Sequence, residues 1–187
     1  GTCVLRLTRA DLQDPAAPRE ADASVTTAAG IACTVLVADC LPVLFAAPGA
    51  RAVGAAHAGW RGLAAGVLEE TLGQVCEAAH CESAQVQCWL GACIGPRRFE
   101  VGVDVLHAFG SAPAGDGGAG ATPGFEPRGN GKWFADLPSL ACTRLRAAGV
   151  TAIHGGQWCT AEGADRFFSY RRDRETGRMA AAIWIER

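Results

Sequence analysis

Apolar residues in this chain gather in short runs that turn residues separate, and short runs of this kind predict β-strands. The clearest run is 32–38, which is mostly apolar and fits a buried strand. Pro42 has no N–H group, so we expect it to interrupt the strand ladder and the next strand to begin after it, at 43–47. The same pattern predicts further strands at 1–8, 52–57, 86–93, 150–154 and 179–185.

Between these runs, apolar positions recur at the spacing of a helix. Residues 63–79 show this most clearly, because Glu69 and Glu70 stand off the apolar face. Helices are predicted at 63–79, 100–109 and 136–148. Segments rich in turn residues predict a loop at 10–20 and a flexible surface loop at 111–131.

The order of these elements indicates the fold class. Strands and helices intermix, which predicts an α/β (α+β) layered β/α sandwich, and the consecutive strands between 32 and 57 favour a mixed sheet over a purely parallel one. The length of 187 residues fits a single domain.

Composition narrows the class of protein. The formal net charge is -2, and no basic face is apparent, which argues against binding to nucleic acid or a membrane surface. No apolar run in the sequence reaches transmembrane length. The chain has nine cysteines, an odd number, without a CxxC pair. We interpret them as reduced thiols, mostly small core residues, and expect a cytoplasmic protein.

The first candidate for chemistry combines the ends of two predicted strands. Asp39 and Cys40 close one apolar strand, and His57 closes another. A sheet fixes groups at its strand ends while the loops expose them. Thiolate and imidazole are good zinc ligands, and they also form the pair used by cysteine nucleophiles. A buried cysteine and a hydrogen-bonded histidine fit the same spacing, and a catalytic zinc has three protein ligands rather than two.

A second candidate follows directly. Residues 57–62 read His-Ala-Gly-Trp-Arg-Gly and lead into a helix. The free N–H groups of a helix start attract anions, and the Arg61 guanidinium adds a bidentate donor. A phosphate or carboxylate is therefore expected beside Trp60 and Arg61, although a tight turn with a surface arginine has the same pattern.

Two further segments carry weaker signals. In 91–102, Cys93 offers a further ligand or nucleophile, but a packed core thiol is the interpretation that we favour. In 167–173, Phe-Phe-Ser-Tyr-Arg-Arg-Asp places aromatic residues next to arginines, which suits a flat polar ligand such as a nucleobase. Its candidate substrate contacts are Ser169, Tyr170 and Arg171. The alternative is an edge strand with Phe168 buried and the arginines in water.

Taken in order, these segments resemble the YfiH family, also called the laccase-domain or polyphenol-oxidase-like family, over nearly the whole chain. The matching stretches are 21–23 with Thr26, 38–44, 57–62, 94–96, 99–102, 136–137, 159–160, 167–173 and 177–180.

The resemblance implies a sandwich similar to the cytotoxic-necrotizing-factor catalytic fold, and a metal ion held by two histidines and one cysteine. The metal would be zinc, or alternatively copper. Cys40 matches the family's cysteine and His57 one of its histidines. The other histidine belongs to a Gln-Val-His-Gly motif whose last residue matches Gly1, so we expect that ligand just before Gly1. Residues 1–187 would then form one YfiH-type domain without its N-terminal quarter.

The resemblance leaves three activities open. The first is a zinc-dependent purine nucleoside enzyme, which splits inosine, adenosine or methylthioadenosine with phosphate or deaminates adenosine. The second is a copper-containing polyphenol oxidase. The third is a metal-independent cysteine hydrolase, with Cys40 as nucleophile and His57 as base, for which peptidoglycan precursors are a suggested substrate.

The residues favour the purine nucleoside enzyme. A multi-copper oxidase needs many histidines, whereas this chain has four, of which one lies in a plausible site. In the purine hypothesis, Arg61 holds phosphate, the segment around Tyr170 lines the base or ribose pocket, and Asp39 orients a ligand or acts as acid or base. The partners would be a nucleoside and phosphate, and both a monomer and a homodimer stay open.

Overall fold

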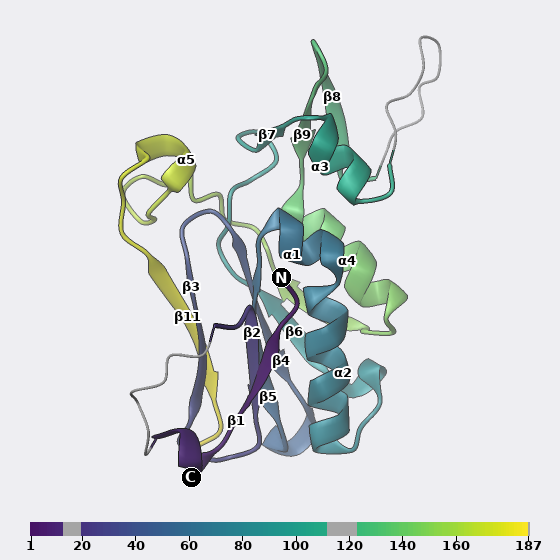
Figure 1. Ribbon diagram of the computed structural model, residues 1–187, viewed down its shortest axis with the longest axis vertical. Coiled ribbons are helices and arrows are strands. Elements are labelled where there is room, and N and C mark those ends of the chain that lie inside the picture. The colour runs from purple at the N-terminus through teal and green to yellow at the C-terminus, as the bar shows by residue number, and fades with distance from the viewer. Residues whose placement is uncertain (13–19, 112–122, 187) are drawn as a thin grey trace.

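A six-stranded mixed sheet forms the centre of the computed structural model, which describes residues 1–12, 20–111 and 123–186 (Figure 1). Its strand order is β1-β2-β5-β4-β6-β10. The bounds are β1 Val4–Leu7, β2 Ala23–Thr26, β4 Leu41–Ala46, β5 Val53–Ala58, β6 Gln87–Leu90 and β10 Ala152–Gly155. The two outer pairs, β1 with β2 and β6 with β10, are parallel, and the inner pairs are antiparallel. The prediction of a mixed sheet is confirmed.

Pro42 lies inside β4, so the prediction that it interrupts the ladder was wrong. It pairs with His57 of β5, and its carbonyl accepts the N–H of Gly91 at 2.9 Å. The N and O of one strand residue point to the same side, which for Pro42 is the side of β6. The paired register with β6 starts one residue later, at Val43. The N–H that Pro42 lacks would have pointed toward β6, just outside the paired region, so its absence costs the sheet no hydrogen bond.

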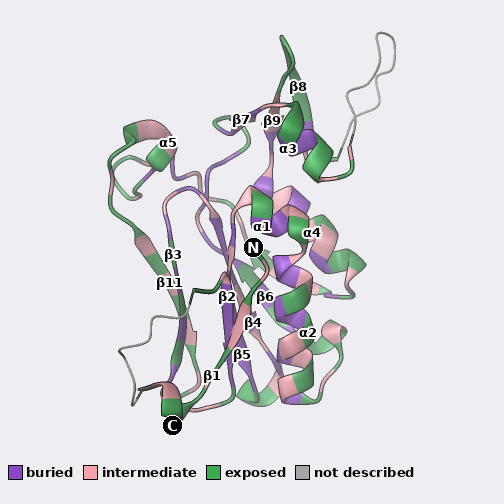
Figure 2. Cartoon of the chain, in the orientation of Figure 1, coloured by how far each residue is buried: buried purple, intermediate pink, exposed green. Residues whose placement is uncertain are grey.

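A two-stranded antiparallel sheet covers one face of the central sheet. It consists of β3 (Ala32–Val37) and β11 (Met179–Trp184). In β3, burial alternates: Cys33 is buried, whereas Leu36 is 58% exposed. The run 32–38 is thus a strand with one solvent face rather than one buried on both faces, because nothing in the described chain covers the outer side of this layer (Figure 2).

Helices cover the opposite face. They are α1 (Trp60–Ala65), α2 (Val67–Ala79) and α4 (Leu137–Ala147). The predicted single helix 63–79 was wrong, because Gly66 adopts φ 101° and separates α1 from α2. The prediction of a helix at 136–148 is confirmed, with the Asp136 carboxylate accepting the N–H of Ser139 as its N-cap.

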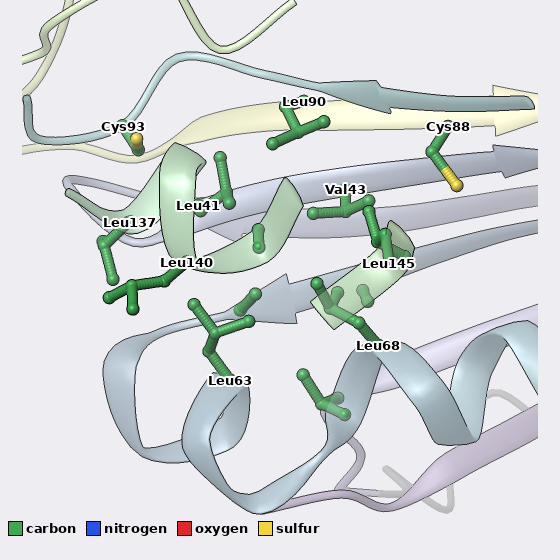
Figure 3. Packing of buried hydrophobic residues seen from close by; sticks show 14 of the residues in the cluster. Leu41, Val43, Leu63, Leu68, Cys88, Leu90, Cys93, Leu137, Leu140 and Leu145 are labelled. Atoms are coloured by element: carbon green, nitrogen blue, oxygen red, sulfur yellow. The ribbon is translucent and has the colours of Figure 1, made fainter. Parts of the chain in front are cut away.

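The main core lies between the central sheet and these helices. Figure 3 shows leucines of α1, α2 and α4 packed against Leu41 and Val43 of β4 and Leu90 of β6. Burial of these aliphatic side chains contributes roughly 25 cal/mol per Å² of apolar surface. This packing holds the strand ends in place without disulfides, since all nine cysteines are free.

A smaller sheet extends from one end of the molecule (Figure 1). Its order is β7-β9-β8, with β7 Glu100–Val101, β9 Lys132–Ala135 and β8 Phe125–Gly129, and helix α3 (Val103–Ala108) precedes β8. The predicted helix 100–109 therefore begins as a strand. The predicted loop 111–131 was wrong over its last part, where buried Phe125 pairs with Ala135; residues 112–122 lie outside the described residues.

The remaining elements are short. They are the 3-10 turns Arg9–Leu12, Pro48–Ala50 and Ser83–Gln85, and the helical turn α5 (Tyr170–Asp173). In the described part of the chain, none of the helices has the length and apolar character needed to cross a bilayer.

Candidate functional site

Cys40 and His57 lie at the same end of the central sheet. Directly opposed residues of an antiparallel pair point to one face, and His57 is opposite Pro42. Cys40 directly precedes β4, and its Sγ would lie 3.0 Å from a Cβ placed on Gly59, which follows directly after β5. β3 and β11 cover the face of His57, since Leu44 of β4 and Ala181 of β11 pack against one cluster, which contains buried Cys33 of β3.

Arg178, the residue before β11, influences the ionisation of both side chains. Burial raises the pKa of the Cys40 thiol, Asp39 raises it further, and Arg178 lowers it. Burial lowers the pKa of His57, the Asp22 carboxylate raises it, and the charge of Arg178 lowers it. The lowered pKa favours the neutral form of His57, which keeps the nitrogen lone pair that a metal needs.

Asp22 links His57 to Gly1. The Gly1 amine lies 2.7 Å from Asp22 Oδ1, and this hydrogen bond lowers the pKa of Asp22. The backbone N–H of His57 donates to the carbonyl of Asp22 at 2.8 Å. Besides burial, the charge of the Gly1 amine lowers the pKa of His57. Gly1, Asp22 and His57 therefore form one neighbourhood at the strand ends.

Asp39 connects three segments that are distant in sequence. Its Oδ1 accepts the Thr160 hydroxyl at 2.5 Å, and its Oδ2 accepts the N–H of Arg171 at 2.6 Å. Its carbonyl accepts the N–H of Ile94 at 2.9 Å. Asp39 is buried and adopts φ 93°, a conformation that an L side chain rarely adopts. Both carboxylate oxygens are thus occupied in holding the site together.

A cavity of about 350 Å³ opens beside Cys40. Its lining residues are Ala38, Asp39, Cys40, Gly59, Trp60, Arg61, Ile94, Phe99, Tyr170 and Arg171. The structure thus gathers most of the predicted site residues from three separate motifs. His57 and Ser169 are the two candidates that do not line this cavity.

Trp60 and Arg61 form one wall of the cavity. The Arg61 guanidinium carbon lies 4.2 Å from the centre of the Trp60 ring, a cation–π contact. Gly59 precedes them, and a Cβ at this position would lie 3.0 Å from Cys40 Sγ, closer than ordinary packing allows. Glycine at 59 therefore leaves the space that the thiol occupies.

Tyr170 and Arg171 also line the cavity. They belong to the helical turn α5, so the alternative of an edge strand was wrong, and Phe168 is 49% exposed rather than buried. The Arg171 guanidinium donates to the carbonyl of Glu100 at 3.0 Å and stacks on Phe99 at 5.3 Å. It therefore holds a neighbouring segment as well as lining the cavity.

Ser169 has a structural place. It is completely buried, and its hydroxyl accepts the N–H of Arg172 at 3.2 Å as the N-cap of α5. The Arg172 guanidinium donates to the carbonyls of Thr160 and Phe167 at 2.8 and 2.9 Å. Neither side chain is free to receive a substrate in this arrangement.

A larger cavity, of about 680 Å³, lies beside Cys159, whose backbone forms an isolated β-bridge with that of Cys93. It is lined by Trp158, Cys159 and the Arg97–Glu162 ion pair, which closes at 2.9 Å. Cys93 is buried, as predicted for a core thiol, and burial raises its pKa. Neither Cys40 nor His57 lines the larger cavity, so we place the candidate chemistry in the smaller one.

Sequence reasoning missed three residues. Asp22 and Arg178 influence the ionisation of His57, and Thr160 anchors Asp39. All three stand in stretches that match the family pattern, yet each is a polar residue in an ordinary surface context. Their roles became visible only in the folded chain, where Asp22 and Arg178 lie near His57 and Thr160 lies beside Asp39.

The side chains at the site show whether it could coordinate a metal ion. A neutral imidazole and a thiol are suitable ligands for zinc or copper. Within the described residues, however, no group of three or more histidine, cysteine, aspartate or glutamate side chains is arranged to hold a metal ion. Cys40 and His57 therefore fit as part of a ligand set and need at least one further ligand.

The comparison with known families decides the classification. A family model described as multi-copper polyphenol oxidoreductase laccase matches residues 1–186. The chain belongs to the YfiH family. Purine nucleoside phosphorylase YfiH of Escherichia coli is 48% identical over 185 residues, which cover 99% of this chain and 70% of the relative. A purine nucleoside phosphorylase of Pseudomonas aeruginosa is 47% identical over 174 residues, 92% of this chain and 68% of the relative.

Solved structures share the YfiH fold. Protein NMB0706 of Neisseria meningitidis has a TM-score of 0.85 and 42% identity, covering 100% of this chain and 72% of that chain. YlmD from Geobacillus stearothermophilus has a TM-score of 0.87 and 31% identity, covering 100% and 71%. The family resemblance and the layered α/β fold are confirmed, while the likeness to the cytotoxic-necrotizing-factor fold stays a prediction.

Proposed function

We propose that this YfiH-family chain carries a purine nucleoside phosphorylase activity in the cavity beside Cys40. The observation that carries the proposal is the meeting of Cys40, the Trp60–Arg61 stack and Tyr170 around one space. Aromatic faces and guanidinium groups suit a purine and an anion respectively. The names of the two similar bacterial relatives support the same activity.

Phosphorolysis places clear demands on such a cavity. An oxygen of inorganic phosphate forms a bond to C1′ of the ribose while the bond from C1′ to the base nitrogen breaks, and the leaving base takes up a proton. Arg61 is exposed and free of protein hydrogen bonds among the described residues, so its positive charge is available to hold phosphate. Tyr170, which is 51% exposed, is placed to cover the base or ribose.

Cys40 and His57 would hold a metal, which we propose to be zinc. A bound zinc would supply a Lewis acid that lowers the pKa of a water ligand. The third ligand would be a histidine just before Gly1 in a longer chain. The position of Gly1 supports this, because the Gly1 amine lies 2.7 Å from the Asp22 carboxylate, and Asp22 is hydrogen-bonded through its carbonyl to the N–H of His57. Copper is the alternative metal.

Adenosine deamination is the second activity that we propose for this site. In that reaction a water oxygen would attack C6 of the purine, and the amino group would leave as ammonia, so the base rather than C1′ would have to lie beside the attacking water. The metal-independent cysteine hydrolase finds less support. Burial raises the pKa of the Cys40 thiol, whereas an activated nucleophile needs a lowered one. No hydrogen bond joins Cys40 to His57 within the described residues.

The polyphenol oxidase finds less support as well. His80 ends α2, His107 is in α3 and His154 is in β10, so the described histidines are dispersed rather than clustered. A multicopper centre needs several histidines together.

The test uses the full-length protein with its metal. Inosine, adenosine and methylthioadenosine are each supplied with and without phosphate, and the free base and ribose 1-phosphate are measured beside the metal content. We expect phosphate-dependent release of the base, and loss of both metal and turnover in Cys40→Ala. Cys142→Ala, which removes a partly buried thiol from α4, is the matched control and should retain both. Full turnover in Cys40→Ala would disprove the proposal.

A further inference from the structure

Helix α2 ends in a Schellman motif in which both contacting positions are cysteines. His80 adopts the left-handed conformation, with φ 50° and ψ 56°. The N–H of Cys81 donates to the carbonyl of Cys76 at 3.1 Å, and the N–H of His80 donates to the carbonyl of Glu77 at 3.3 Å. This pair of bonds folds the chain back so that the side chains at 76 and 81 meet.

The Cys81 thiol lies close enough to Cys76 to influence its ionisation. Burial raises the pKa of Cys76, a contact with the Ser83 hydroxyl lowers it, and the nearby Cys81 thiol raises it. Cys76 Sγ also lies 3.9 Å from Ser83 Oγ. The two backbone bonds of the Schellman motif bring the side chains of Cys76 and Cys81 together, and both side chains line the same surface hollow.

Small reagents can reach this pair. Cys76 and Cys81 are partly exposed and line a surface hollow of about 490 Å³, together with His80. The next thiol, Cys88, behaves differently: it is 1% exposed, and burial raises its pKa to about 12. A reagent that enters the hollow therefore meets Cys76 and Cys81 and not Cys88.

We propose that Cys76 and Cys81 form a redox-active dithiol that a hydroperoxide converts reversibly into a disulfide. The Cys81 thiolate attacks the peroxide oxygen, so that one S–O bond forms, the O–O bond breaks and one water leaves. The Cys76 thiol then attacks the Cys81 sulfur, the S–O bond breaks and a second water leaves. In total, two thiols and one hydrogen peroxide give one disulfide and two waters.

The order of the two steps follows from the surroundings. The thiolate is the attacking form, and burial disfavours it at Cys76. Cys76 is therefore the resolving thiol, held at the place where the oxidised Cys81 sulfur forms. The left-handed His80 already closes the short loop, so the disulfide requires little movement of the backbone. This chemistry is independent of the nucleoside activity proposed above.

The sequence provides a direct assay. A protease that cuts after glutamate cleaves at Glu70, Glu77 and Glu82, which puts Cys76 in the fragment 71–77 and Cys81 in the fragment 78–82. The full chain is reduced, treated folded with hydrogen peroxide, alkylated, digested and analysed by mass spectrometry. We expect these two fragments to be joined, and to separate again after reduction with dithiothreitol.

Two variants serve as controls. Cys81→Ser removes one sulfur at a partly exposed position and should abolish the joined fragments, while Cys142→Ser should leave them unchanged; far-UV circular dichroism confirms that both variants are folded. Cys81 oxidised to sulfinic acid with Cys76 left alkylated would overturn the proposal. A mixture in which Cys76 is joined to several other cysteines would also overturn it, because it would show that the helix end does not select the partner.

Discussion

The cavity beside Cys40 has a floor and a rim that differ in how their polar groups are satisfied. The floor is the hydrogen-bonded set Asp39, Thr160, Ser169 and Arg172, of which only Asp39 lines the cavity itself. These residues donate and accept hydrogen bonds among themselves and with the backbone. In the rim, the side chains of Cys40, Trp60, Arg61 and Tyr170 form no hydrogen bond to the described residues. Polar side chains of the floor thus stabilise the fold, because their hydrogen-bonding groups are paired within the protein. Those of the rim are unpaired in the part of the chain that the structure describes and remain available to a ligand.

The strongest test of the floor is Asp39→Ala. This change leaves the Thr160 hydroxyl and the Arg171 N–H without their buried acceptor, so we expect unfolding free energy to fall by about 3 kcal/mol. Urea denaturation measures it. Asp39→Asn keeps one acceptor oxygen and should lose less. An unchanged midpoint in Asp39→Ala would show that Asp39 does not hold the floor together.

The matching test of the rim is Arg61→Ala. Arg61 is exposed, stacks on the Trp60 ring and forms no hydrogen bond or ion pair with the described residues, so stability should stay within about 0.5 kcal/mol. If Arg61 holds phosphate, KM for phosphate should rise by about tenfold, which corresponds to roughly 1.4 kcal/mol. Arg51→Ala, another exposed arginine at a distant turn, is the control. Equal KM values for phosphate in the two variants would show that Arg61 does not bind phosphate.

The third prediction compares the alkylation rates of an accessible thiol, Cys40, and a buried thiol, Cys88, as the pH changes. Burial raises the pKa of Cys40, so its reactive thiolate is the minor form at pH 7, and alkylation should accelerate about tenfold per pH unit as pH rises. Cys88, with its pKa near 12 and 1% exposure, should be alkylated only after unfolding. Mass spectrometry of metal-free folded protein between pH 7 and 9 tests both. Faster labelling of Cys88 than of Cys40 would contradict the placement of the cavity.

The smallest effect is expected for Ser169→Ala. The variant loses the N-cap of α5, which typically stabilises a helix start by about 1 kcal/mol. Thermal denaturation should show a lower Tm, and Ser169→Asp, which can also cap, should restore much of it. If Ser169→Ala instead changed KM at an unchanged Tm, Ser169 would belong to the rim.

Several features of the fold were accessible from the sequence because they depend on local patterns. The alternating and apolar runs located β3, β5, β6, β10 and β11, and the helical period located α4. Strand β2 escaped notice because its sequence, Ala-Ser-Val-Thr, consists mostly of small and polar residues and forms no apolar run. The break at Gly66 was missed because a glycine inside a helical pattern is usually tolerated, and only the left-handed φ at this position separates α1 from α2.

By itself, the sequence determined the chemical character of the site: a thiol, an imidazole, a guanidinium and aromatic rings at strand ends and turns, in the order typical of the YfiH family. The tertiary structure decided which of them share a space. Asp39 became scaffold because Thr160 and Arg171, more than a hundred residues away in the chain, occupy both of its oxygens. Hydrogen bonds between distant segments have no period or spacing in the sequence, so only the folded chain shows which polar groups are satisfied and which face a ligand.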